Sequence, residues 1–210
     1  MFGQALKFFV VFFVVVDPVS LIPLFTGLTA GASSSFKRRM ALQAVAISAT
    51  ILALFALGGA AFLQLMGISL EAFRIFGGLL LFLLALEMVF ARQSGTRTSS
   101  DEAAEARQRA DISVFPLAFP FIAGPGALAT ILLWFGPVHP FANTTLFLGL
   151  SVAVILVLAI ALACLLLADR LMGVIGVTGA NVASRLLGVI LGALAVQFVL
   201  DGLRQTFGLS

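Results

Sequence analysis

The chain has 210 residues, of which 61% are hydrophobic and only 10% are charged. Soluble domains carry about 25% charged residues, and the apolar residues here form long blocks, so the composition excludes a soluble domain and indicates a polytopic helical membrane protein. The 12 lysines and arginines outnumber the 9 acids but form no basic stripe with interleaved aromatics, which argues against nucleic-acid binding. The single cysteine excludes a disulfide framework.

Hydropathy predicts six membrane-spanning helices, each close to the ~20 residues that cross a bilayer. In chain order they cover residues 5–29, 41–65, 72–91, 113–135, 144–168 and 183–203. Residues 1–92 and 113–210 would form two halves, joined by the polar linker 93–112. The alternative, in which the interrupted first and fourth spans are re-entrant hairpins, is less favoured because it places Lys7 on the same side as the basic cluster at 37–39.

The first predicted span is interrupted at its centre by Asp17-Pro18. A lone carboxylate at that depth costs a few kcal/mol or more, and a proline frees backbone groups that lipid cannot satisfy. Such a sequence is tolerated only where it faces protein or a water-filled cavity. Asp17 suits a helix N-cap and Pro18 a first helical turn, so we expect one half-helix to end near Val16 and another to begin at Pro18.

The fourth predicted span is interrupted in the same way by Gly124-Pro125-Gly126, without a polar side chain. Two half-helix N-termini at mid-membrane would favour an anion, such as the carboxylate of a small zwitterion. Asp17 would accept from the ligand's ammonium or carry a coupling proton, and two hydroxyls would lie one turn further on. The candidate substrate-binding residues are Asp17, Pro18, Ser20, Gly124, Pro125, Gly126 and Thr130. The plainer alternative is that both breaks are packing devices.

The two halves also resemble each other. Three matched pairs recur in the same order at spacings of 107, 106 and 111 residues: Asp17-Pro18 with Gly124-Pro125, 65–68 with 171–174, and 74–79 with 185–190. The change in spacing indicates a five-residue insertion at 176–180. Because each half has three spans, the second would enter the membrane upside down. The fold class predicted is therefore an all-α membrane protein of two inverted three-helix repeats, with discontinuous helices 1 and 4.

Orientation follows from the positive charges beside the predicted spans. The loops after the first, third and fifth spans hold nine lysines and arginines, while the other side holds only Lys7, Arg74 and Arg204. The side with nine basic residues is predicted to be cytoplasmic. Both termini would then be periplasmic and the 93–112 linker cytoplasmic.

Four stretches carry a family resemblance. They are Asp17-Pro18 with Pro23-Leu24-Phe25, the run Phe73–Gly78, the string Pro116–Ala127 that includes Phe-Pro-Phe-Ile-Ala-Gly-Pro-Gly, and the closing run Ala195–Gly202. Together they resemble the MarC family of bacterial and archaeal inner-membrane proteins over the whole chain. The resemblance implies six spans and transport of small neutral amino acids, of the glycine and alanine type.

The expected function is therefore secondary transport of small neutral amino acids across the inner membrane, proton-coupled or export-directed. A membrane-embedded enzyme is disfavoured, because an aspartyl protease needs two intramembrane aspartates and Asp17 has no such companion. The single histidine, His139, is predicted in a loop, so we expect no catalytic residue, metal or cofactor. A pore or a non-transporting structural membrane protein is the alternative. The expected partners are an amino-acid substrate and the lipid bilayer, and the sequence leaves the oligomeric state open.

Overall fold

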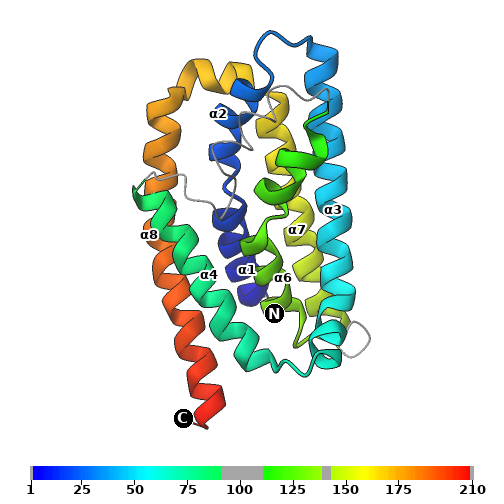
Figure 1. Ribbon diagram of the computed structural model, residues 1–210, viewed down its shortest axis with the longest axis vertical. Coiled ribbons are helices and arrows are strands. Elements are labelled where there is room, and N and C mark those ends of the chain that lie inside the picture. Colours follow the sequence, from blue (N-terminus) through cyan, green and yellow to red (C-terminus); the bar gives the residue numbers. More distant parts are fainter. Residues whose placement is uncertain (1, 91–110, 139–142, 209–210) are drawn as a thin grey trace.

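A computed structural model of the chain describes residues 2–90, 111–138 and 143–208, and every element in these ranges is helical (Figure 1). The segments are α1 (Phe2–Val16), α2 (Pro18–Leu28), α3 (Ser34–Leu65), α4 (Leu70–Phe90), the π-helical segment η1 (Ser113–Ile122), α6 (Pro125–Phe135), α7 (Thr144–Leu166) and α8 (Ala168–Phe207). The predicted all-α class is confirmed. Of the predicted 93–112 linker, only Asp111 and Ile112 fall within the described residues.

Five of the helical stretches are long and apolar enough to cross a membrane, and a sixth is added if η1 and α6 count as one bent span. The result agrees with an integral membrane protein of about the predicted number of spans. The ends of the long helices follow from local sequence. For α3, the Ser33 hydroxyl accepts from the N–H of Phe36 at 3.3 Å, and Gly67, with φ of 70°, stops the helix at its other end.

The first span is the core of the bundle. In its most apolar window, within Gly3–Leu28, 61% is buried, against 22% to 33% for the other candidate spans. In Figure 1, α1 and α2 run through the middle of the molecule, with α3 and α7 on one side and α4 and α8 on the other. The carboxylate of Asp17, the costliest group for lipid in this span, is thus enclosed by protein.

Helices α4 and α8 form the most extensive helix pair in the bundle. Glycines allow their close approach: a Cβ atom at Gly78 would lie 2.7 Å from a methyl of Val199, and one at Gly188 would lie 2.7 Å from the Cβ of Met88. Close packing on small residues is the usual way for helices to associate in a membrane. This pair fixes the position of α8 beside the central span.

The start of the last helix differs from the sequence expectation. Residues 176–180 were expected to be an insertion and the sixth span to begin at 183, but α8 begins at Ala168 and continues to Phe207. Gly176, with φ of 66° and ψ of 172°, is not helical, so α8 consists of two helical parts that meet at a kink there. In Figure 1 the first part of α8 crosses the end of the bundle before the chain turns along α4. Ser184, in the part of α8 after the kink, is therefore buried beside the first break.

Candidate functional site

The first break is centred on Asp17. Its N–H donates to the carbonyl of Phe13 at 2.9 Å, which closes the last turn of α1. Its backbone is left-handed, with φ of 48°, a conformation that aspartate tolerates better than most residues. Pro18 then opens α2 as its first residue. The chain thus ends one helix at Val16 and starts the next at Pro18, the positions that the sequence suggested.

The carboxylate of Asp17 is completely buried and is held by two hydroxyls. Ser20 Oγ lies 2.5 Å from Asp17 Oδ2, and Ser184 Oγ donates to the same oxygen at 2.9 Å. The hydroxyls of Ser20 and Ser184 also contact each other. A weaker bond of 3.4 Å joins the N–H of Ser20 to Asp17 Oδ1, which makes Asp17 the N-cap of α2.

Ser184 comes from α8 and was not among the predicted site residues, since the sequence placed it at the very start of the sixth span, 183–203. It belongs to a buried series of small residues spaced four apart, Ala180, Ser184 and Gly188, which faces the bundle. A hydroxyl inside an otherwise apolar helical stripe was the available signal. That Ser184 contacts Asp17 could be recognised only once the position of α8 relative to α2 was known.

The Asp17 carboxylate has no positive partner among the residues that the structure describes. The ion pair found there, between Lys37 and Asp169, lies elsewhere. A buried carboxylate normally pairs with a cation or exchanges its charge for a proton. Two neutral hydroxyls replace a cation only in part. The described residues therefore leave a negative charge on Asp17 without a balancing positive charge.

The second break is built from backbone. Segment η1 is interrupted by extended residues at Phe115 and Phe119 and meets α6 at an angle of 53°. Gly124 is the N-cap of α6 in an extended conformation, without a side-chain cap, and Pro125 is the first helical residue. A Cβ atom at Gly124 would overlap the carbonyl oxygen of Pro120, so glycine is required by space.

The N–H groups of Gly126 and Ala127 lie in the first turn of α6, where an α-helix has no internal acceptors for them. Thr130, one turn on, is buried, and its hydroxyl donates to the carbonyl of Gly126 at 2.8 Å. The predicted hydroxyl of the second break is therefore bonded within its own helix. It does not reach toward the Asp17 cluster.

A small space of about 20 Å³ adjoins this second break. Its walls come from α1, α4, η1 and α6, and they include Val15, Leu84, Gly124, Pro125 and Gly126. A volume of that size holds about one water molecule and is too small for an amino acid. Val15 is only two residues before Asp17, so the last turn of α1 joins the two breaks.

The predicted residues thus form two groups. Asp17 and Ser20 meet around Ser184, with Pro18 beginning the helix beside them. Gly124, Pro125 and Gly126 line the small space. Thr130 joins neither group through its hydroxyl. No cluster of three or more potential metal ligands occurs in the described ranges.

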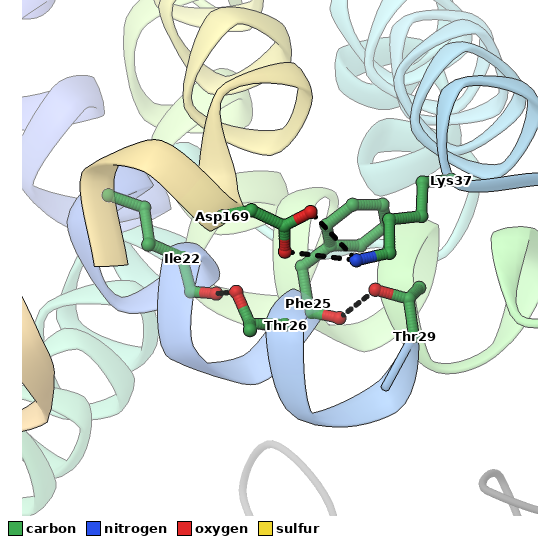
Figure 2. Close-up of polar contacts among 6 residues, drawn as sticks. All are labelled: Ile22, Phe25, Thr26, Thr29, Lys37 and Asp169. Atoms are coloured by element: carbon green, nitrogen blue, oxygen red, sulfur yellow. Dashed lines mark hydrogen bonds and ion pairs between the residues drawn. The ribbon is translucent and has the colours of Figure 1, made fainter. Parts of the chain in front are cut away.

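One end of the bundle carries the charged contacts. Lys37 Nζ lies 2.9 and 2.8 Å from the two carboxylate oxygens of Asp169, which ties α3 to the start of α8. Figure 2 shows this pair beside the last turn of α2, where the Thr29 hydroxyl donates to the carbonyl of Phe25 at 2.7 Å. Asp169 is 60% exposed, so the pair contributes little to stability.

Asp111 lies just before η1 and accepts from both the hydroxyl and the N–H of Ser113, at 2.6 and 2.8 Å. These bonds, the hydroxyl first, hold the pKa of Asp111 below its usual value, with a smaller contribution from Arg39. The carboxylate thereby anchors the entry into the second broken region.

Comparison with known proteins identifies relatives along the whole chain. Residues 2–207 match the family described as MarC family integral membrane protein. The UPF0056 membrane protein YhcE of Escherichia coli (strain K12) is 33% identical, over 96% of this chain and 92% of its own. The UPF0056 membrane protein YvbG of Bacillus subtilis (strain 168) is 32% identical, over 99% of this chain and 97% of its own.

A UPF0056 membrane protein of Aquifex aeolicus (strain VF5) is 33% identical, over 95% of this chain and 92% of its own. No solved structure matches. The family match spans both breaks, together with the helices that enclose them. The chain therefore belongs to the MarC family of integral membrane proteins.

Proposed function

We propose that this protein is a secondary transporter of small neutral amino acids, such as glycine and alanine, in the inner membrane. The observation that carries the proposal is the Asp17 carboxylate, which is fully buried at the first break and has no cationic partner among the described residues. Ionisable residues buried in membrane helices commonly mark the path of a substrate or ion. An ammonium group of a substrate would supply the missing positive charge.

The second break supports the other half of a zwitterion site. The first turn of α6 offers the N–H groups of Gly126 and Ala127 and the positive end of the helix dipole, which favour a carboxylate. Both breaks touch the last turn of α1, through Val15 and Asp17. An α-amino acid, whose ammonium and carboxylate are attached to the same carbon, would bridge them, and a small side chain suits the narrow apolar walls.

The small space beside the second break must enlarge for a substrate to enter. It holds about one water molecule, so the proposed cycle includes movement of η1 and α6 away from α1 and α4. The proposed architecture provides for that movement. The two three-helix halves, with discontinuous first helices, would be inverted repeats that rock against each other around the site. Both termini would be periplasmic and the 93–112 linker cytoplasmic.

Uptake by the purified full chain in liposomes tests the proposal. Labelled glycine or alanine should enter and should be exchanged by unlabelled substrate, without an ohmic current in a planar bilayer. Asp17→Asn should abolish uptake. Asp201→Asn is the matched control, because it removes a carboxylate that accepts from Gln197 near the other end of α8. A current without saturable uptake would favour a pore, and no uptake of any amino acid would refute transport.

A further inference from the structure

Three oxygen atoms at the first break contact one another in a closed triangle. They are Asp17 Oδ2, Ser20 Oγ and Ser184 Oγ, with Ser20 at 2.5 Å and Ser184 at 2.9 Å from the carboxylate oxygen. The third side of the triangle is the contact between the two hydroxyls. Asp17 has no exposed surface and Ser184 is buried, while Ser20 is partly buried.

The triangle can be analysed by counting protons. Each hydroxyl supplies one proton and an ionised carboxylate supplies none, so an ionised Asp17 leaves one of the three contacts without a hydrogen. That contact would set two oxygen lone pairs against each other beside a carboxylate that has no exposed surface. A proton on Asp17 gives each contact one hydrogen, with every oxygen donating once and accepting once.

A metal ion does not replace this proton. Ligand oxygens lie about 2.0 to 2.6 Å from Mg²⁺ or Ca²⁺, and an ion at the centre of a triangle of oxygens in direct contact would be much closer than that. No further carboxylate or histidine in the described ranges completes a metal-binding group. The arrangement suits the smallest cation.

Among the described residues, no charged side chain other than Asp17 itself makes a hydrogen bond or ion pair within the triangle. Helices α6, α7 and α8 pack on the broken span, and α2 and α6 have no ionisable side chain. The ionisable residues of the other segments that surround the break are Lys7 on α1, Glu71, Arg74 and Glu87 on α4, Cys164 on α7, and Asp169, Arg170, Arg185, Asp201 and Arg204 on α8. Arg185 follows Ser184 directly but is exposed, whereas Ser184 is buried. Within the described residues, the hydrogen-bonding side chains around Asp17 are the two serines.

We propose that Asp17, Ser20 and Ser184 form a proton site, and that its proton and the ammonium of the substrate compete for the Asp17 carboxylate. This rests on the proposed function. The carboxyl O–H bond breaks as the proton leaves to water on one side of the membrane, and the carboxylate then binds the ammonium. After the substrate leaves on the other side, Asp17 takes a proton from that side. One proton therefore moves opposite to each neutral substrate, which is exchange and not cotransport.

Proteoliposomes with equal pH inside and outside, and with the membrane potential clamped, distinguish these modes. Labelled glycine is added outside and lumenal pH is followed with a trapped dye. Exchange predicts that glycine enters and the lumen becomes more alkaline, with about one proton leaving per glycine. Glycine entry with acidification, or with no pH change, overturns the exchange while leaving the transport function intact. Absence of glycine entry overturns both.

Infrared difference spectroscopy tests the proton site without relying on transport. The substrate-free protein should show the C=O band of a protonated carboxylic acid that is lost on adding glycine and is absent in Asp17→Asn. A wild-type protein without that band would overturn the proton site, whatever its transport activity.

Ser184→Ala keeps the test open if Asp17→Asn fails to fold. The protonated triangle loses two hydrogen bonds and the ionised form only one, so inhibition of glycine uptake by acid should weaken about three- to tenfold, the worth of one net hydrogen bond. Ser151→Ala is the matched control, because Ser151 donates within α7 to the carbonyl of Phe147 at 2.8 Å. Equal acid inhibition in wild type and Ser184→Ala would contradict the triangle.

Discussion

Each of the two breaks in this bundle ends one helical segment and begins another, but the first uses a carboxylate side chain and the second uses backbone alone. At the first, Asp17 takes a left-handed conformation and caps α2 with its own side chain, and two serines surround the carboxylate. At the second, Gly124 is extended and uncapped, and the space that a side chain would fill is occupied by backbone. The first break thus contributes an ionisable side chain, while the second contributes backbone N–H groups.

Asp17→Gly removes the carboxylate, so the first break, like the second, is then built from backbone alone. Of the predicted changes, this one should reduce transport most. Glycine adopts a φ of 48° without strain, so the helix break is retained while the carboxylate is lost. Removing the partner of a buried charge costs about 2 to 5 kcal/mol, so glycine uptake should fall about a hundredfold. Proteoliposome uptake, with melting temperature as the control for folding, measures this. Normal uptake would show that backbone alone makes the site.

Gly124→Ala adds a side chain to the break that has none. Its Cβ would overlap the carbonyl oxygen of Pro120, which is backbone and cannot rotate away. Overpacking of this kind costs about 1 to 3 kcal/mol, so the melting temperature in detergent should fall. Gly173→Ala is the control, because a Cβ there meets nothing within 4 Å. Equal melting of both variants would contradict the crowding at the second break.

Gly126→Ala tests whether the small space at the second break binds substrate, without destabilising the fold. Its Cβ would lie 3.1 to 3.3 Å from side-chain atoms of Leu84, Leu81 and Val15, which can shift. We expect the melting temperature to change little. Uptake of alanine should fall about tenfold relative to wild type, because a methyl group in a tight apolar site has about that effect. An unchanged rate would place the substrate away from this space.

The smallest expected effect is that of Asp111→Asn, at the entry to the second broken region, on the pH dependence of the melting temperature. Because the bonds from Ser113 hold the pKa of Asp111 below its usual value in the folded protein, the ionised form stabilises the fold above about pH 4. That stability is lost as pH falls through the folded pKa. Asp111→Asn should therefore have a melting temperature that depends less on pH in this acid range. Identical acid profiles for the variant and the wild type would refute the role of Ser113.

Local sequence determines the breaks but not what meets at them. Asp17-Pro18 and Gly124-Pro125 each contain their own reason to end one helix and begin another, so α2 and α6 begin where the sequence suggested. The hydroxyl of Thr130 could not be placed from sequence, because a threonine in a helix can donate to its own backbone or to a neighbour. Here it donates to Gly126.

The course of α8 depended on long-range packing. Glycines and polar residues between 168 and 182 weakened the apolar signal there, so the helix was expected to begin too late. The bend at Gly176 and the fit of α8 against α4 bring Ser184 to the first break. Neither the bend nor this packing can be predicted from the residues around Asp17.

The contact between Asp17 and Ser184 also orders events during biosynthesis, because the two residues are 167 positions apart in the chain. Translation at about 5 to 20 residues per second separates their emergence from the ribosome by roughly 8 to 33 s. During that interval the first span has entered the membrane, while its carboxylate has only the neighbouring Ser20 as a side-chain partner. The buried carboxylate therefore gains its second side-chain partner only after α8 has been made and has packed beside α2.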